Sequence, residues 1–137
     1  YGNEIGMQGG RDPENRAPFP WDESRWDHDL LQAFKTFTHL RHAHPVLRTG
    51  EYVPIYAEGQ HLMILRHLEG QRMLTAFNAN DYNWDLNIAL ESQLDNGTHL
   101  KDLLSGGEAV IQDGYLRNYV LPPWEGAIFE PQLDNQH

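Results

Sequence analysis

Asp12 and Arg16 stand four residues apart in a proline-rich polar segment, and their side chains have complementary chemistry. A carboxylate accepts hydrogen bonds and a guanidinium donates them, so such a pair can satisfy two neighbouring hydroxyl groups of a sugar. The same side chains could instead form an exposed ion pair that stabilises the loop, worth about 0–1 kcal/mol. The spacing alone leaves both interpretations open.

His39, His42 and His44 form the cluster that most resembles a metal site. His39 and His42 would lie on the same face of a helix, near enough to share an ion. No carboxylate is spaced to complete the ligand set, and histidine is also favoured in the last turn of a helix. The glycines near the start match neither the dinucleotide fingerprint nor the P-loop. We therefore expect no metal and no cofactor.

Two groups of aromatic residues could stack on sugar rings. Phe19 and Trp21 come just before an expected helix, a position where an aromatic side chain more often packs in a core. The second group is interleaved with leucine and valine, which favours core packing as well: Trp84, Tyr115, Tyr119 and Trp124.

Length and composition limit the function classes. The chain has 137 residues, 39% of them hydrophobic, which suits one globular domain or a small domain with part of another. Its net charge of −10 disfavours nucleic acids and anionic membranes as partners and does not affect neutral sugars. The absence of cysteine excludes disulfides and suits a cytoplasmic protein, but secreted bacterial enzymes also often lack cysteine, so the compartment stays open.

The first part of the chain, up to about residue 49, predicts a long loop followed by one helix. Three prolines lie between residues 11 and 20, and such a segment sustains neither a helix nor a central strand. Asp27 is a good N-cap for the helix, and Pro45 would end it. Apolar residues recur between them at helical spacing and predict one buried face: Leu30, Ala33, Phe34, Phe37 and Leu40.

The second part, from about residue 50 onward, predicts an antiparallel β-sandwich. Two apolar runs, residues 62–67 and 72–78, flank Glu69 and Gly70, which is a hairpin signal. Large apolar residues at 84, 86, 88 and 90 alternate with Asp85, Asn87 and Ala89, as in a half-buried strand. Further short runs at residues 109–112 and 127–130, with turn signals between them, are typical of a sandwich.

The opening residues resemble the end of the catalytic barrel in α-amylase-family glycoside hydrolases, and most closely the neopullulanase, cyclomaltodextrinase and maltogenic amylase group. The resemblance rests on YGNEIGM at residues 1–7, GG at 9–10, DP at 12–13, Arg16, Pro18 and WD at 21–22. The motifs LR at 40–41 and HPVLRTG at 44–50 resemble the passage into the next domain. Asn3 departs from the family, which usually has Asp there, and residues 14–15 replace a stretch that often carries Asp and Cys.

The resemblance implies the end of a (β/α)8 TIM barrel followed by an antiparallel β-sandwich known as domain C. Residues 1–49 would be the C-terminal end of the catalytic barrel, with the end of strand 8 at Tyr1, its loop at residues 6–26 and helix 8 at residues 27–43. Residues 50–137 would be domain C. The resemblance also implies that Asp12 and Arg16 hold a glucose unit of the substrate. Glu4 would either line the base of the cleft or tie strand 8 to its neighbours.

The implied parent protein is a retaining hydrolase of α-glucans or maltooligosaccharides that cuts α-1,4 bonds, with α-1,6 bonds as an open second target. Retaining hydrolysis needs two carboxyl groups about 5–5.5 Å apart. In this family the catalytic Asp and Glu, and a second Asp, follow barrel strands 4, 5 and 7, which would lie upstream of Tyr1. We therefore expect no catalytic residue in this segment and no activity from it alone. The alternatives are a free-standing carbohydrate-binding β-sandwich and a non-catalytic structural subunit.

A single barrel helix cannot bury its own apolar face. The face formed by Leu30, Phe34 and Phe37 would stay exposed, although burial of each such side chain contributes about 1.5–3 kcal/mol. We therefore expect the remainder of the barrel, as a separate chain in the structure, to cover it.

Overall fold

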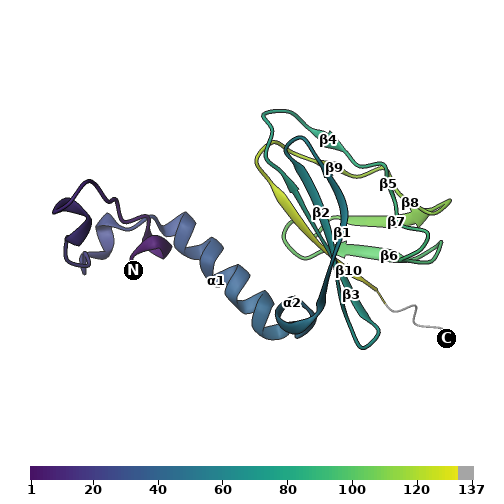
Figure 1. Ribbon diagram of the computed structural model, residues 1–137, viewed down its shortest axis with the longest axis horizontal. Helices are drawn as coiled ribbons and strands as arrows, with labels where there is room; N and C mark the ends of the chain where they lie inside the picture. Colours follow the sequence, from purple (N-terminus) through teal and green to yellow (C-terminus); the bar gives the residue numbers. More distant parts are fainter. Residues whose placement is uncertain (133–137) are drawn as a thin grey trace. The chain divides into compact units, whose positions relative to one another are not determined.

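The computed structural model describes residues 1–132 (Figure 1). The chain divides into two compact units, Tyr1–His44 and Pro45–His137. The structure of each unit follows from its own sequence. No helix among residues 1–132 combines the length and apolar character needed to cross a lipid bilayer.

The first unit begins with three short 3-10 turns, η1 (Asn3–Ile5), η2 (Glu14–Arg16) and η3 (Glu23–Arg25). Gly2 and Gly6 flank η1 with φ angles of 81° and 69°, which a residue without Cβ adopts at little cost. Residues 3–5 therefore form a turn, and the strand end that the family resemblance implies at Tyr1 stays a prediction. A barrel strand is held by hydrogen bonds to neighbouring strands. The described residues of this unit include no strand that could provide those bonds.

Helix α1 (His28–Ala43) begins and ends as predicted. The Asp27 carboxylate accepts a hydrogen bond from the backbone N–H of Leu30 at 2.9 Å, which confirms the N-cap. No residue of α1 is buried, and Phe34 and Phe37 are 44% and 45% exposed. The apolar face is thus not buried within the described residues, although η1 packs against α1.

The second unit starts with the short helix α2 (Val46–Thr49) and continues as ten antiparallel strands among the described residues. Eight of them form one sheet in the order β1-β2-β3-β10-β6-β7-β8-β5, and β4 and β9 form a second pair. The strands are β1 (Glu51–Glu58), β2 (His61–Leu68), β3 (Gln71–Asn78), β4 (Trp84–Asp85), β5 (Ile88–Ala89), β6 (His99–Asp102), β7 (Glu108–Gln112), β8 (Tyr115–Leu116), β9 (Val120–Leu121) and β10 (Gly126–Pro131).

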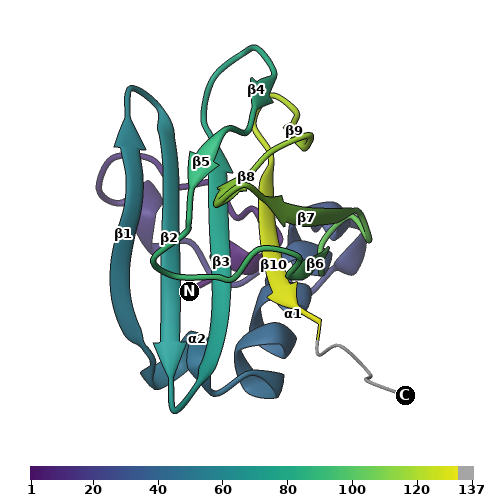
Figure 2. The ribbon, with the colours of Figure 1, turned by 90° about the vertical axis from the view of Figure 1, so that its right-hand side faces the viewer.

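The predicted antiparallel sandwich is confirmed. Figures 1 and 2 show β6, β7, β8 and β5 facing the longer strands β1, β2, β3 and β10, so that the sheet nearly closes on itself. One apolar core fills the space between the two layers, and its largest fully buried side chains include Phe129, Met63, Leu65 and Leu74. The inward side chains alternate along each strand, as the period of a pleated strand requires.

The hairpin predicted at Glu69 and Gly70 joins β2 to β3. Leu68 pairs with Gln71, so the turn has two residues, and both have positive φ angles, 48° and 85°. The single strand predicted at residues 84–90 is instead two short strands, of which β4 pairs with β9 and β5 pairs with β8. The predicted alternation of burial still holds along this segment, because Trp84, Leu86, Ile88 and Leu90 all face the same core.

Strand β1 is one edge of the large sheet and contains Pro54. Pro54 is paired with Ile64, and the register between β1 and β2 shifts between Pro54 and Tyr56. Proline has no N–H to donate to a ladder, so it is tolerated at an edge strand or beside a bulge. Both conditions are met here.

Candidate functional site

The structure brings Asp12 and Arg16 together. An Nη atom of Arg16 donates to Asp12 Oδ2 at 2.9 Å, with the two side chains 75% and 60% exposed. Arg16 is the last residue of η2, and this single turn places it beside Asp12. The remaining guanidinium N–H groups and carboxylate lone pairs face solvent, where they are available to hydroxyl groups of a ligand. Whether they bind sugar stays a prediction.

The loop that carries this pair is closed at its base. The N–H of Asp27 donates to the carbonyl oxygen of Ile5 at 3.0 Å, so the two ends of the loop meet. The hydroxyl of Tyr1 also donates to the carbonyl oxygen of Ala17. A cavity of about 210 Å³ lies inside the loop and is lined by Gly6, Met7, Gln8, Ala17, Pro18, Pro20 and Arg25.

Three aromatic rings pack together at the end of the loop. The ring centroid of Phe19 lies 4.8 Å from that of Trp21 and 5.9 Å from that of Trp26. The indole N–H of Trp26 donates to the carbonyl oxygen of Pro20 at 2.6 Å, which fixes the approach to α1. Trp21 is 82% exposed, so it is not a core residue within this chain.

Glu4 is partly buried beside the helix rather than inside the loop. It lines an apolar hollow of about 560 Å³ together with the side of α1 formed by Leu31, Phe34, Lys35, Thr38, His39 and His42. Within residues 1–132 no three His, Cys, Asp or Glu side chains are arranged to hold a metal ion. The hollow is thus the uncovered side of α1 and not a ligand cluster.

In the second unit, the predicted aromatic group is divided between core and surface. Trp84 is 7% exposed and stacks on His61 with 4.4 Å between ring centroids. Tyr119 packs edge-on against Phe129 at 4.9 Å. Trp124 is 70% exposed, so the core expectation is wrong for this residue and right for Trp84.

Two buried polar side chains hold the sandwich loops, and sequence reasoning did not single them out. Asp102 is 1% exposed and accepts hydrogen bonds from Leu104, Ser105, Tyr119 and Ile128. Burial acts to raise the pKa of Asp102, but these hydrogen bonds, led by the Ser105 hydroxyl, outweigh it and hold the pKa below its ordinary value. Burial, together with the neighbouring Asp102 carboxylate, raises the pKa of the Tyr119 phenol.

Asn78, the other buried polar residue, is 2% exposed. Its Nδ2 lies 2.8, 3.0 and 2.9 Å from the carbonyl oxygens of Tyr82, Leu121 and Pro122, so its two N–H groups are shared among three acceptors. Both Asn78 and Asp102 occupy positions where the alternation of their strands points inward, and a polar residue at an inward position was the signal that could have revealed them.

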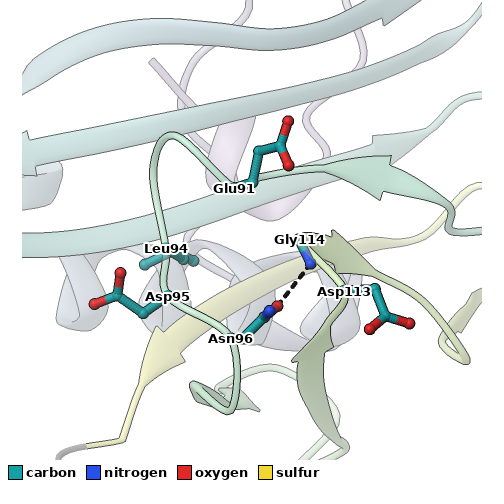
Figure 3. A pocket seen from close by; sticks show the side chains of 6 residues that line it. All are labelled: Glu91, Leu94, Asp95, Asn96, Asp113 and Gly114. Atoms are coloured by element: carbon teal, nitrogen blue, oxygen red, sulfur yellow. Dashed lines mark hydrogen bonds between the residues drawn. The ribbon is translucent and has the colours of Figure 1, made fainter.

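An acidic hollow of about 440 Å³ lies on the surface of the sandwich (Figure 3). Figure 3 shows the carboxylates of Glu91, Asp95 and Asp113 pointing away from one another around it. The one hydrogen bond drawn among its lining residues runs from Gly114 N–H to Asn96 Oδ1, at 2.6 Å. Divergent carboxylates form neither a ligand set nor a catalytic pair.

Comparison with known proteins gives the family of the sandwich. A family model described as "Neopullulanase-like, C-terminal domain" matches residues 52–130. An amylopullulanase from Thermoanaerobacter thermohydrosulfuricus is 31% identical over 125 residues, which cover 83% of this chain and 8% of that protein. A cyclomaltodextrinase from a Bacillus species is 38% identical over 80 residues, which cover 57% of this chain and 14% of that protein.

A solved structure extends the similarity along the chain. The crystal structure of Ttha1563 from Thermus thermophilus matches with a TM-score of 0.86 and 39% identity, covering 96% of this chain and 27% of that one. This chain therefore spans only a small part of the relatives it matches. The family-model match and these relatives confirm the resemblance found in the sequence: the chain belongs to the neopullulanase-like C-terminal domain family of α-amylase-family glycoside hydrolases.

Proposed function

We propose that this chain is the C-terminal part of a retaining α-glucan hydrolase that acts on α-1,4-glucosidic bonds, with α-1,6 bonds as a second target to be tested. In this proposal residues 50–137 are domain C. Residues 1–49 are the end of the catalytic (β/α)8 barrel and supply part of the wall of the substrate cleft. The catalytic carboxylates belong to the preceding part of the protein, and this segment contributes none of them.

The main support is the length of the relatives. The amylopullulanase match covers 8% of that protein, and the cyclomaltodextrinase match covers 14%. The Ttha1563 match covers 96% of this chain, so in that protein the counterparts of most of residues 1–44 and of the sandwich belong to one longer polypeptide. Proteins that share this domain thus carry it beside much more chain, which is where the reacting groups would reside.

Helix α1 supplies an independent argument for a covering partner. Its apolar side is exposed, with Phe34 and Phe37 each more than two-fifths accessible. Burial of such a side chain stabilises a protein by about 1.5–3 kcal/mol, so a helix of this kind normally packs on something. In the proposal that surface is covered by the rest of the barrel, which also supplies the neighbouring strands for a strand that ends at Tyr1.

Two measurements test the proposal: the anomeric configuration of the first product, and whether the 137-residue chain alone has activity. The longer protein is expected to release a product whose new reducing end is first the α-anomer, because two inversions at the anomeric carbon retain configuration. Proton NMR during hydrolysis of maltoheptaose measures this directly. The 137-residue chain alone should release no reducing sugar. Turnover by the chain alone, or a β-anomer as the first product, would contradict the proposal.

A further inference from the structure

We propose that the end of the sandwich opposite α2 is a carbohydrate-binding surface, where Tyr82 and Trp124 stack on an α-glucan chain. We call these two rings, with Asp81 and Glu125 next to them in sequence, the distal aromatic surface. The identity of the ligand rests on the proposed function, whereas the surface itself rests on the geometry of the second unit.

Strand register fixes the location of this surface. An Nη atom of Arg66 donates to the carbonyl oxygen of Gly50 at 2.8 Å, so α2 lies beside the end of β2 that carries residues 66–68. His61, at the other end of β2, contacts Tyr82, and the loops at residues 79–83 and 122–125 therefore gather there. Figures 1 and 2 both show β4 and β9 at this end of the long strands, opposite α2.

The two loops that carry the rings are joined by buried hydrogen bonds. The side-chain amide of Asn78 donates to the carbonyl oxygen of Tyr82 in one loop and to that of Pro122 in the other. Its Oδ1 accepts from Asn80 N–H at 3.1 Å, and Trp124 N–H donates to the carbonyl oxygen of Asn80 at 3.2 Å. Ligand binding would therefore order little additional backbone, which favours affinity.

Both rings are exposed although the fold gains nothing from their exposure. Trp124 is 70% exposed and has a φ of 59°, a left-handed conformation that is unfavourable for a bulky residue. Such an outlier on a surface is evidence for a role other than folding. Tyr82 is 57% exposed, while the edge-on contact with His61, at 5.9 Å between centroids, holds its ring in place.

The chemistry of the surface favours a neutral, hydroxyl-rich ligand. The negative face of an aromatic ring attracts the C–H groups that line one side of a glucose ring. Asp81 and Glu125 precede Tyr82 and follow Trp124 in sequence and are exposed, and carboxylates accept hydrogen bonds from hydroxyl groups. The same carboxylates, in a chain with a net charge of −10, repel phosphate-bearing polymers and are unfavourable in an apolar protein interface.

Titration of the 137-residue chain with maltoheptaose, followed by calorimetry, tests the surface. Trp124→Ala and Tyr82→Ala are each expected to weaken binding by roughly three- to tenfold, the range that corresponds to the loss of one aromatic contact. Tyr52→Ala is the matched control, because Tyr52 is 59% exposed on β1 near the α2 end and should leave affinity unchanged. Absence of binding by the unmodified chain, or equal binding by Trp124→Ala, would overturn the proposal.

A second measurement separates this surface from the cleft and from an internal interface. In the longer protein, Trp124→Ala should retain kcat/KM on maltotriose, which is too short to bridge two sites, and should lose adsorption to granular starch. A longer protein without hydrolytic activity defeats the proposed function and leaves the binding result intact. The contribution of Trp124 to the tryptophan fluorescence of the longer protein is the difference between wild type and Trp124→Phe. If acrylamide does not quench that contribution, Trp124 is buried in a domain interface and the surface proposal is overturned.

Discussion

Asp102→Asn tests the buried carboxylate that accepts hydrogen bonds from four residues of the sandwich. Oδ1 of Asp102 accepts from the N–H groups of Leu104 and Ile128, both at 3.0 Å. Oδ2 accepts from the hydroxyls of Ser105 at 2.5 Å and Tyr119 at 2.8 Å. These contacts join the turn after β6 to β10 and to the segment before β9, so one carboxylate connects three parts of the fold.

The expected loss follows from the charge of the acceptor. A hydrogen bond to a charged group contributes about 1.5–3 kcal/mol, whereas a neutral one contributes about 0.5–1.5 kcal/mol. The oxygen of an asparagine side chain can still accept from the N–H groups of Leu104 and Ile128. Its NH₂ group, however, replaces an acceptor by a donor, so the hydroxyls of Ser105 and Tyr119 must rotate to accept. Four weakened bonds, offset by the easier burial of a neutral amide, give a net loss of about 2 kcal/mol. The melting temperature should then fall by roughly 8–16 °C.

The pH dependence of this loss has a definite sign. The hydrogen bonds to Asp102 lower its pKa in the folded state despite its burial, so the unfolded chain binds the proton more readily. The stabilisation is therefore fully present above the unfolded pKa of about 3.9 and is lost as the pH falls through the lower folded value. The gap in unfolding free energy between wild type and Asp102→Asn should be widest at neutral pH and should narrow below about pH 4.

Urea unfolding followed by circular dichroism at pH 7, 4 and 3 measures both effects. Asp85→Asn serves as the control, because Asp85 is exposed and its replacement should change stability by less than about 0.5 kcal/mol. A gap below about 0.5 kcal/mol at pH 7 would refute the assigned role of the charge. A gap of full size that persists unchanged to pH 3 would refute the pKa argument.

Two further predictions concern the hairpin and the loop pair. Glu69 has a φ of 48°, a conformation that asparagine tolerates better than glutamate. Glu69→Asn should therefore raise the free energy of unfolding by about 0.5–1 kcal/mol in thermal unfolding, and the control Glu69→Gln should give no such gain. In the longer protein, Asp12→Ala and Arg16→Ala should each lower kcat/KM on maltotriose by about tenfold through loss of one charged hydrogen bond, while stability stays within about 0.5 kcal/mol because the pair is exposed. Glu14→Ala, in the same exposed turn, is the kinetic control, and an unchanged kcat/KM for both Asp12 and Arg16 variants would remove them from the cleft.

The parts of the fold that sequence reasoning predicted correctly are those with local signals. Asp27 and Pro45 mark the limits of α1 because a capping carboxylate and a missing N–H act on their immediate neighbours. The β2–β3 hairpin was predictable because its two-residue turn fixes the register. The division of residues 84–90 between two strand pairs was not, because pairing partners about thirty residues away decide where a strand is interrupted.

The candidate site shows the same limit. The approach of Arg16 to Asp12 needs only one turn of chain, and the sequence spacing allowed for it. The joining of the Tyr82 and Trp124 loops depends on Asn78, whose hydrogen bonds reach residues more than forty positions away. No local pattern indicates such a contact. The exposure of Trp124 likewise depends on how the sheet closes, and the interleaving of the aromatic group with leucine and valine favoured the opposite result.

The proline in β1 affects how this chain behaves beside other copies of itself. A free sheet margin with an unbroken row of donors and acceptors can recruit strands from neighbouring molecules and extend into fibrils. At Pro54 that row lacks one donor, and the irregular register next to it bends the margin. The strand at the opposite edge of the sheet, β5, is only two residues long, which is too short to pair stably with a strand of another molecule. The sandwich is therefore protected against self-association at both margins, even at high local concentration.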